Sequence, residues 1–230
     1  MTKSIKLGGL SALSGALLIA TTLGTGSLQA GTIVGTAHDF SASGWSGGEI
    51  CVACHTPHNS DTTVADAPLW NHAVTTETFI MYSGPGTLDA TQDAQPTGTS
   101  KLCLSCHDGA TALDSFGGNI GATVMAGPAA IGGDADSLTN DHPISILYNT
   151  ALSTTDPGLH DPAATTVTIG LGGDKPRTGT IDTVMLSGGK VQCTSCHDVH
   201  NGSVGPGSNF DPFLKVSKAG STICLTCHDK

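Results

Sequence analysis

Four short stretches with a common pattern decide the fold of this chain. They are Cys51-Val-Ala-Cys54-His55, Cys103-Leu-Ser-Cys106-His107, Cys193-Thr-Ser-Cys196-His197 and Cys224-Leu-Thr-Cys227-His228. All eight cysteines of the 230-residue chain lie in these stretches. In a Cys-x-x-Cys-His motif the two thiols add to the vinyl groups of one haem, and the histidine binds its iron. The pattern therefore predicts four covalently attached c-type haems.

Zinc is the main alternative for these cysteines. Four Cys-x-x-Cys pairs could form two sites of four thiolates each, and a single pair could also be a redox motif. Both readings leave the histidine after every second cysteine unexplained, four times out of four. We therefore expect haem iron at all four motifs.

The composition agrees with a chain wrapped around large apolar cofactors. Only 12% of the residues are charged, against about 25% in an average soluble domain, and only 4% are aromatic, whereas 31 are Gly and 11 are Pro. Four macrocycles, each burying area like several aromatic side chains, would fill the interior that side chains leave open. The fold class expected is mostly irregular coil with short helices at the haem motifs and a few short strands. Residues 165–171 and 180–186 alternate in the manner of a β-hairpin.

The N-terminal 30 residues have the layout of a secretory signal peptide. Lys3 and Lys6 precede an apolar stretch that ends near Leu23, and cleavage is expected after Ala30. Interrupting Gly and Ser residues make the stretch too polar for a membrane span. We expect residues 31–230 to form one exported tetrahaem cytochrome c domain without a membrane span after signal cleavage.

The net charge limits the classes of partner that the protein is expected to bind. Nine Lys+Arg against 19 Asp+Glu give −10, and loss of the signal segment takes this to −12. A nucleic-acid partner is therefore not expected, because such proteins need a basic face.

The second axial ligands are expected to be histidines. Six histidines lie outside the motifs, for four places, whereas a mature chain would hold only three methionines. Bis-histidine haems have lower potentials than Met-ligated ones and are closed to exogenous ligands, which favours electron transfer over catalysis. His160, in a turn before Pro162, is the weakest candidate. The distal ligands expected are His38, His58, His72, His142 and His200.

Two of these candidates follow a motif histidine by three residues, in His55-Thr-Pro-His58 and His197-Asp-Val-His200. On a helical turn the two side chains would be neighbours. They cannot bind opposite faces of one haem, so each second histidine is expected to serve a different haem. For His142, Asp141 or a backbone carbonyl is expected to hold the ring tautomer.

The order of the motifs resembles that of the multihaem c-type cytochromes of metal-reducing bacteria. The resemblance rests on His38-Asp-Phe-Ser, the Cys-x-x-Cys-His-Thr-Pro-His58 motif, Leu69-Trp-Asn-His72, Asp141-His-Pro-Ile and the Cys-x-x-Cys-His-Asp-Val-His200 motif. It is similar in particular to extracellular tetrahaem members that polymerise into conductive filaments. This resemblance implies a head-to-tail homopolymer with stacked bis-histidine haems and one histidine that ligates a haem of the next subunit.

By the same resemblance His58 is the histidine that crosses between subunits, with His38 as the other candidate near the N-terminus. Further partners implied are other multihaem cytochromes and extracellular acceptors such as metal oxides. Two other functions remain open. A periplasmic electron shuttle would have the same haems and would not polymerise, and a multihaem reductase would need a haem with an open axial position.

Overall fold

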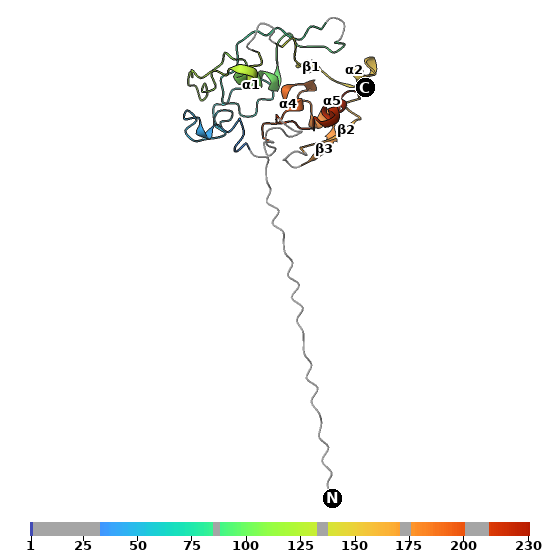
Figure 1. The fold of residues 1–230 in the computed structure, drawn as a ribbon, viewed down its shortest axis with the longest axis horizontal. Coiled ribbons are helices and arrows are strands. Elements are labelled where there is room, and N and C mark those ends of the chain that lie inside the picture. The colour runs from blue at the N-terminus through green and yellow to red at the C-terminus, as the bar shows by residue number, and fades with distance from the viewer. Residues whose placement is uncertain (2–32, 85–87, 133–137, 171–175, 201–211) are drawn as a thin grey trace.

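The computed structural model describes Met1 and residues 33–84, 88–132, 138–170, 176–200 and 212–230. The predicted signal segment, apart from Met1, lies outside these residues. In the described part, no helix has the length and apolar character needed to cross a membrane. Figure 1 shows a single folded body in which the described N-terminal segment, in blue, lies on the opposite side from the C-terminus.

Regular structure occupies a small share of the folded body, and much of it lies at the motifs. Among the described residues the longest helix is α1, Gly98–His107, which carries the second motif. Helices α4, Cys193–Cys196, and α5, Thr222–Leu225, lie at the third and fourth motifs. The other helices are α2 at Thr150–Thr155, α3 at Ile181–Val184 and the 3-10 turns η1, η2 and η3 at Phe40–Ala42, Gly127–Ala129 and Ala219–Ser221.

The part of the chain that the structure describes has two small antiparallel sheets, both in the C-terminal half. Strand β1, Ile146–Leu147, pairs with β4, Lys190–Val191. Strand β2, Thr166–Ile169, pairs with β3, Arg177–Thr180. The hairpin predicted from the sequence is therefore present, but its second strand lies earlier in the chain than predicted and ends at Thr180. Residues 181–184 are not extended but form α3, and the first residue of this helix, Ile181, is fully buried.

Hydrophobic side chains form three separate clusters in the described part of the chain. The largest has Tyr148, Ile169, Ile181, Met185 and Val216 at its centre. The other two are smaller, and both include a residue of α1. Their buried members are Val64, Trp70 and Leu102 in one, and Phe79, Leu104 and Leu138 in the other.

Helices α1 and α4 pack against each other at their N-terminal ends. The backbone N–H of Cys193 donates to Ser100 Oγ at 2.9 Å, and the Thr99 and Thr194 hydroxyls are 2.6 Å apart. Gly98 has a φ of +50°, and a Cβ built there would lie 3.3 Å from Gln192 Nε2. Glycine thus suits both the backbone angle and the close approach of the two helices.

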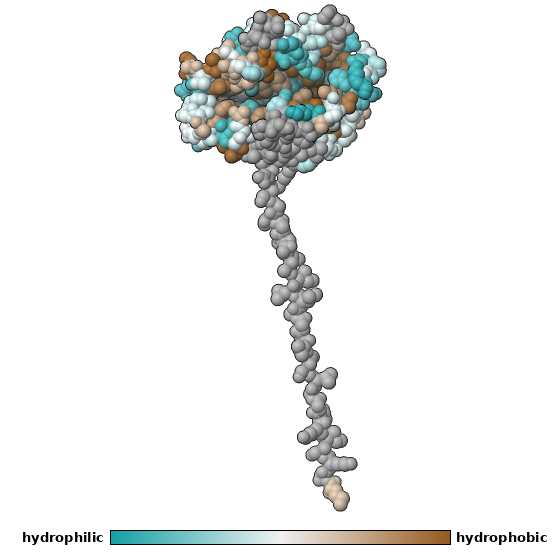
Figure 2. All heavy atoms as spheres, viewed as in Figure 1, coloured by the Kyte–Doolittle hydropathy of each residue, from teal (hydrophilic) through white to brown (hydrophobic). Residues whose placement is uncertain are grey.

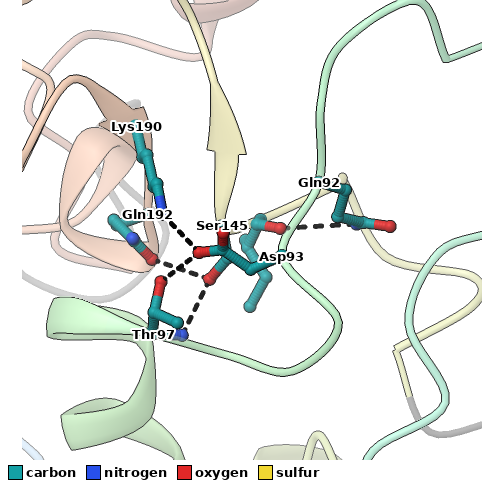
Figure 3. A network of polar contacts seen from close by, with 7 residues as sticks. Gln92, Asp93, Thr97, Ser145, Lys190 and Gln192 are labelled. Carbon is teal, nitrogen blue, oxygen red and sulfur yellow. Dashed lines mark hydrogen bonds and ion pairs between the residues drawn. The ribbon is translucent and has the colours of Figure 1, made fainter.

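A polar network surrounds this helix contact (Figure 3). Lys190 Nζ and Thr97 Oγ1 both donate to Asp93 Oδ2, at 2.5 and 2.6 Å. Ser145 Oγ accepts from the Thr97 backbone N–H at 3.0 Å and donates to Gln192 Oε1 at 3.2 Å. The network therefore joins residues near the start of α1 to those that precede α4, and so connects the second and third motifs.

Candidate haem-binding site

The Cys-x-x-Cys-His motifs adopt a turn that brings each histidine back over its first cysteine. The backbone N–H of His55 donates to the Cys51 carbonyl at 2.9 Å. The corresponding bonds of the third and fourth motifs, from His197 to Cys193 and from His228 to Cys224, are 3.0 and 2.9 Å long. The second motif lies entirely within α1. All eight cysteines are described, and each is a free thiol.

The first and third motifs are each hydrogen-bonded by a short segment of the same local structure. Two short segments that begin with a proline supply it: Pro68-Leu-Trp-Asn71 for the first motif and Pro212-Phe-Leu-Lys215 for the third. We call these segments the straps. In each, the fourth residue donates its N–H to the carbonyl of the second motif cysteine, at 2.9 Å for Asn71 and 2.8 Å for Lys215.

Two further features of the straps agree. The carbonyl of the second strap residue accepts the N–H of the residue after the motif histidine, from Thr56 to Leu69 at 2.9 Å and from Asp198 to Phe213 at 2.8 Å. Leu69 and Phe213 also share an unusual backbone angle, with φ of 52° and 54°. The chain thus contains a structural repeat of one motif with its strap, which the different spacings in the sequence conceal.

The fourth motif has part of this arrangement. Residues 157–160 precede it in the sequence but provide the same backbone bonds, from His160 N–H to the Cys227 carbonyl and from Asp229 N–H to the Gly158 carbonyl, both at 2.9 Å. The second motif differs, because the N–H after its histidine, that of Asp108, stays within the helical pattern and donates to Leu104. Three of the four motifs are therefore held by an added extended segment.

Each of five histidine rings has Nδ1 against a backbone carbonyl oxygen, at 2.6–2.9 Å. The pairs are His55 with Pro68, His72 with Ala73, His107 with Ala129, His142 with Pro143 and His197 with Pro212. A carbonyl can only accept, so Nδ1 carries the proton and Nε2 keeps its lone pair. Histidines that bind metals are usually oriented in this way. The arrangement of these rings thus fits iron bound at Nε2.

Three motif histidines each face a histidine from elsewhere in the chain. The ring centroids of His55 and His200 are 6.2 Å apart, those of His107 and His38 are 6.0 Å apart, and those of His228 and His142 are 6.3 Å apart. With metal–nitrogen bonds of about 2 Å, the centroids of two imidazoles on opposite sides of one iron lie about 6 Å apart. The spacing of all three pairs therefore fits bis-histidine ligation.

His38 has the surroundings expected of a neutral ligand. Its Nδ1 is buried and has no hydrogen-bond partner among the described residues. Burial, followed by the charges of His107 and His200, lowers the pKa of His38 to about 4. The ring is therefore neutral at pH 7, which is the form that binds metals. A buried nitrogen without a hydrogen bond is uncommon unless it has another partner, such as a metal.

The remaining candidates are placed differently. His72 is buried, and its Nε2 lies 3.5 Å from Cys106 Sγ of the second motif. His58 is exposed, and its ring has no partner in the described part of the chain. No histidine ring contact is found for His197 among the described residues. His160 lies against the fourth motif through its backbone. The structure thus brings three of the predicted distal histidines to motif histidines and leaves His58 at the surface.

The expected helical turn at the two His-x-x-His sequences is wrong. His197 ends α4 with extended angles, φ −110° and ψ 142°. His55 pairs with Trp70 in an isolated bridge, as His197 does with Leu214. The backbone hydrogen bonds to the strap hold the motif histidine in an extended conformation, so the helical turn ends at this residue. His200 nevertheless faces His55 and not its own motif histidine. That each second histidine serves a different haem stays a prediction.

Sequence reasoning missed the residues that orient the ligand rings. The carbonyls of Pro68, Ala129 and Pro212 belong to segments 13 to 22 residues from the histidines they hold. A proline followed by two large apolar residues, in Pro68-Leu-Trp and Pro212-Phe-Leu, was the available signal. For His142, the structure selects the backbone carbonyl of Pro143 as the partner of Nδ1.

Two methionines lie in hydrophobic clusters and not beside a motif histidine. Met185 is buried in the largest hydrophobic cluster, and Met81 packs against the cluster of Phe79. Among the described residues, which include every cysteine, no three side chains of the metal-binding type converge as a zinc site would require.

Comparison with known proteins identifies one part of the chain. Residues 186–230, which contain the third and fourth motifs, match the family model described as a doubled CXXCH motif. This match indicates a c-type cytochrome-like haem-binding region, in which haem c is bound covalently, and a general role in electron transfer. No curated protein matches the chain.

Proposed function

We propose that the chain carries four bis-histidine c-type haems and transfers electrons along them, without being an enzyme. The three pairs of facing histidines, with centroids 6.0–6.3 Å apart, carry this proposal. Each pair joins one motif histidine to one histidine from a distant segment, so both axial positions of an iron would be filled. An iron with two protein ligands has no open site for a substrate, which disfavours the reductase alternative.

When bound, the haems would supply the redox chemistry, and the chain would supply their attachment and orientation. The cysteine pairs would hold the macrocycle edges, and the carbonyls of the straps would fix the motif histidine rings. The helix contact between α1 and α4 would keep the second and third haems at a fixed separation, because it joins the helical turns that carry Cys103 and Cys193. A fixed separation favours electron transfer because no rearrangement has to precede it.

We further propose that subunits join head to tail through His58, in an exported filament that passes electrons to extracellular acceptors such as metal oxides or to other multihaem cytochromes. The structural repeat supports this step. In the third motif unit, His200 faces the motif histidine of another haem. His58 holds the equivalent place in the first unit but is exposed, while His197 has no facing histidine among the described residues. A ligand and a site that do not meet within one chain can meet between two copies, as in an open, heterologous assembly.

The test compares His58→Ala with His160→Ala in mature protein, using mass spectrometry, electron paramagnetic resonance and electron microscopy. Both variants should retain four haems. His58→Ala should give monomers or short oligomers with one haem per subunit no longer low-spin bis-histidine, whereas His160→Ala should form ordinary filaments. If His58→Ala forms normal filaments with every haem low-spin, His58 is only a neighbour of the first haem. In that case His72→Ala becomes the variant to examine, since His72 is the other unpaired candidate.

A protein that never forms filaments, in wild type as in the variants, would instead be a periplasmic electron shuttle with the same haems. Fewer than four haem masses would contradict the tetrahaem assignment itself.

A further inference from the structure

One of the oriented histidines differs from the others in the group that holds its Nδ1. Five rings use an uncharged backbone carbonyl, whereas His200 Nδ1 lies 3.3 Å from Oδ1 of the Asp198 carboxylate. The backbone N–H of His200 donates to the same oxygen at 3.0 Å. Among the described residues, this is the one histidine ring seen against a carboxylate.

Asp198 is held in place by the strap of the third unit. Its backbone N–H donates to the Phe213 carbonyl at 2.8 Å, and its side chain is only 20% exposed. An aspartate side chain is ordinarily ionised at neutral pH, and this carboxylate lies against both the ring and the backbone N–H of His200.

Lys215, the lysine that influences Asp198 electrostatically, forms no direct ion pair with it among the described residues. Its Nζ donates instead to the Val184 carbonyl at 3.3 Å. The Asp198 carboxylate thus interacts mainly with His200.

The equivalent position in the first unit is neutral. There Thr56 follows the motif histidine, and its hydroxyl accepts from the His58 N–H at 3.4 Å. The two units share their backbone structure and differ in the charge of this one side chain. The fourth motif offers a second comparison, because Asp229 also follows a motif histidine but is exposed.

We propose that Asp198 is a positioning residue that lowers the reduction potential of the haem bound by His55 and His200 relative to the other haems. A carboxylate that accepts from the second ring nitrogen makes the ligating nitrogen a stronger donor, and this stabilises ferric over ferrous iron. The inference rests on the proposed function, since it requires His200 to be an axial ligand. Its consequence is that the first haem gives up an electron most readily, so the haem potentials along the chain are unequal.

The experiment is a spectroelectrochemical titration of the mature holoprotein carrying Asp198→Asn. Asparagine keeps the shape of the side chain and an acceptor oxygen for the backbone N–H of His200, but it removes the charge. One of the four haem components should shift to higher potential, while all four remain low-spin. Asp198→Thr, which installs the side chain of the first unit, should shift the same component in the same direction. Agreement between two neutral side chains of different shape assigns the effect to charge.

Asp229→Asn is the matched control, because it removes one charge at the same sequence distance from a motif histidine. The inference is overturned if Asp198→Asn leaves the titration unchanged, or if Asp229→Asn produces a shift as large. It is also overturned if Asp198→Asn turns a haem high-spin, since Asp198 would then be needed for ligation itself. Failure of the proposed function would be seen differently, as fewer than four haem masses or as high-spin haem in the wild-type protein.

Discussion

The first and third motif units have the same local structure but different surroundings. Both place a motif histidine under a proline strap, with the same backbone bonds and the same positive φ at the second strap residue. The third strap continues into Val216, a member of the largest hydrophobic cluster, and Gln192 of the polar network immediately precedes its motif. The first strap contributes Trp70 to a cluster with only two other buried residues.

This difference indicates how each unit is stabilised. The third unit has protein on several sides, from the strands β1 and β4, the cluster of Val216 and the polar network. Among the described residues the first unit packs against a smaller apolar cluster, with Val64 and Leu102 as its other buried members, and its haem would supply much of its apolar contact area. We therefore expect the first unit to depend on its haem for order and the third unit to depend on it less.

The largest effect should come from removing one haem at a time. Cys51→Ser with Cys54→Ser should abolish the hydrogen-exchange protection of the Asn71 and Thr56 N–H groups, bringing their local opening free energy close to zero. Cys193→Ser with Cys196→Ser should leave the Lys215 N–H substantially protected, because the polypeptide still packs around it. Hydrogen exchange monitored by mass spectrometry measures both. Equal loss of protection in the two double variants would show that both units depend on haem alike.

The sequence predicts the four motifs because haem attachment demands adjacent residues, and it limits the distal ligands to the few histidines outside them. It does not predict the straps, since Pro68 and Pro212 reach their histidines from 13 and 15 residues away through backbone groups, which any residue carries. The position of β3 was misjudged for a related reason. The β-branched residues Ile181, Thr183 and Val184 favour a strand, but the burial of Ile181 and Met185, four residues apart, in the main cluster selects the helical turn α3. Tertiary packing here overrides local preference.

A smaller effect is expected where the polar network meets the third unit. Burial favours a raised pKa for Asp93, but the hydrogen bonds from Lys190 and Thr97 and the charge of Lys190 outweigh it and lower the pKa. A carboxylate whose pKa is lower in the folded state stabilises the protein at pH values above its unfolded-state pKa, which is near 3.8. This stabilisation is lost as the pH falls through the folded-state pKa.

Asp93→Asn should therefore destabilise the protein at pH 7 by about 1 kcal/mol, the usual worth of a hydrogen bond, and should remove this part of the acid sensitivity. Denaturant unfolding at pH 7 and at pH 3 measures both quantities. Asp61→Asn is the control, because Asp61 accepts from Thr63 in the first unit and lies outside the network. If the stability difference between wild type and Asp93→Asn is the same at both pH values, the charge of Asp93 does not stabilise the contact between α1 and α4.

The smallest effect, and the sharpest comparison of the two straps, concerns their second residues. Leu69 and Phe213 both have a positive φ, which costs a residue with a Cβ about 1–2 kcal/mol, whereas glycine adopts it freely but loses about 0.5–1 kcal/mol more entropy on folding. Leu69 is 56% exposed, so Leu69→Gly should stabilise the protein by roughly 0.5 kcal/mol, the difference between these two terms.

The Phe213 ring lies 5.0 Å from the ring of His38, and Phe213→Gly would lose this aromatic contact as well as side-chain burial. Phe213→Gly should therefore be destabilising although the backbone angle is the same. Thermal unfolding of the two variants decides the point: a loss of stability in Leu69→Gly equal to that in Phe213→Gly would mean that the strap angle carries no strain and that both side chains act by packing alone.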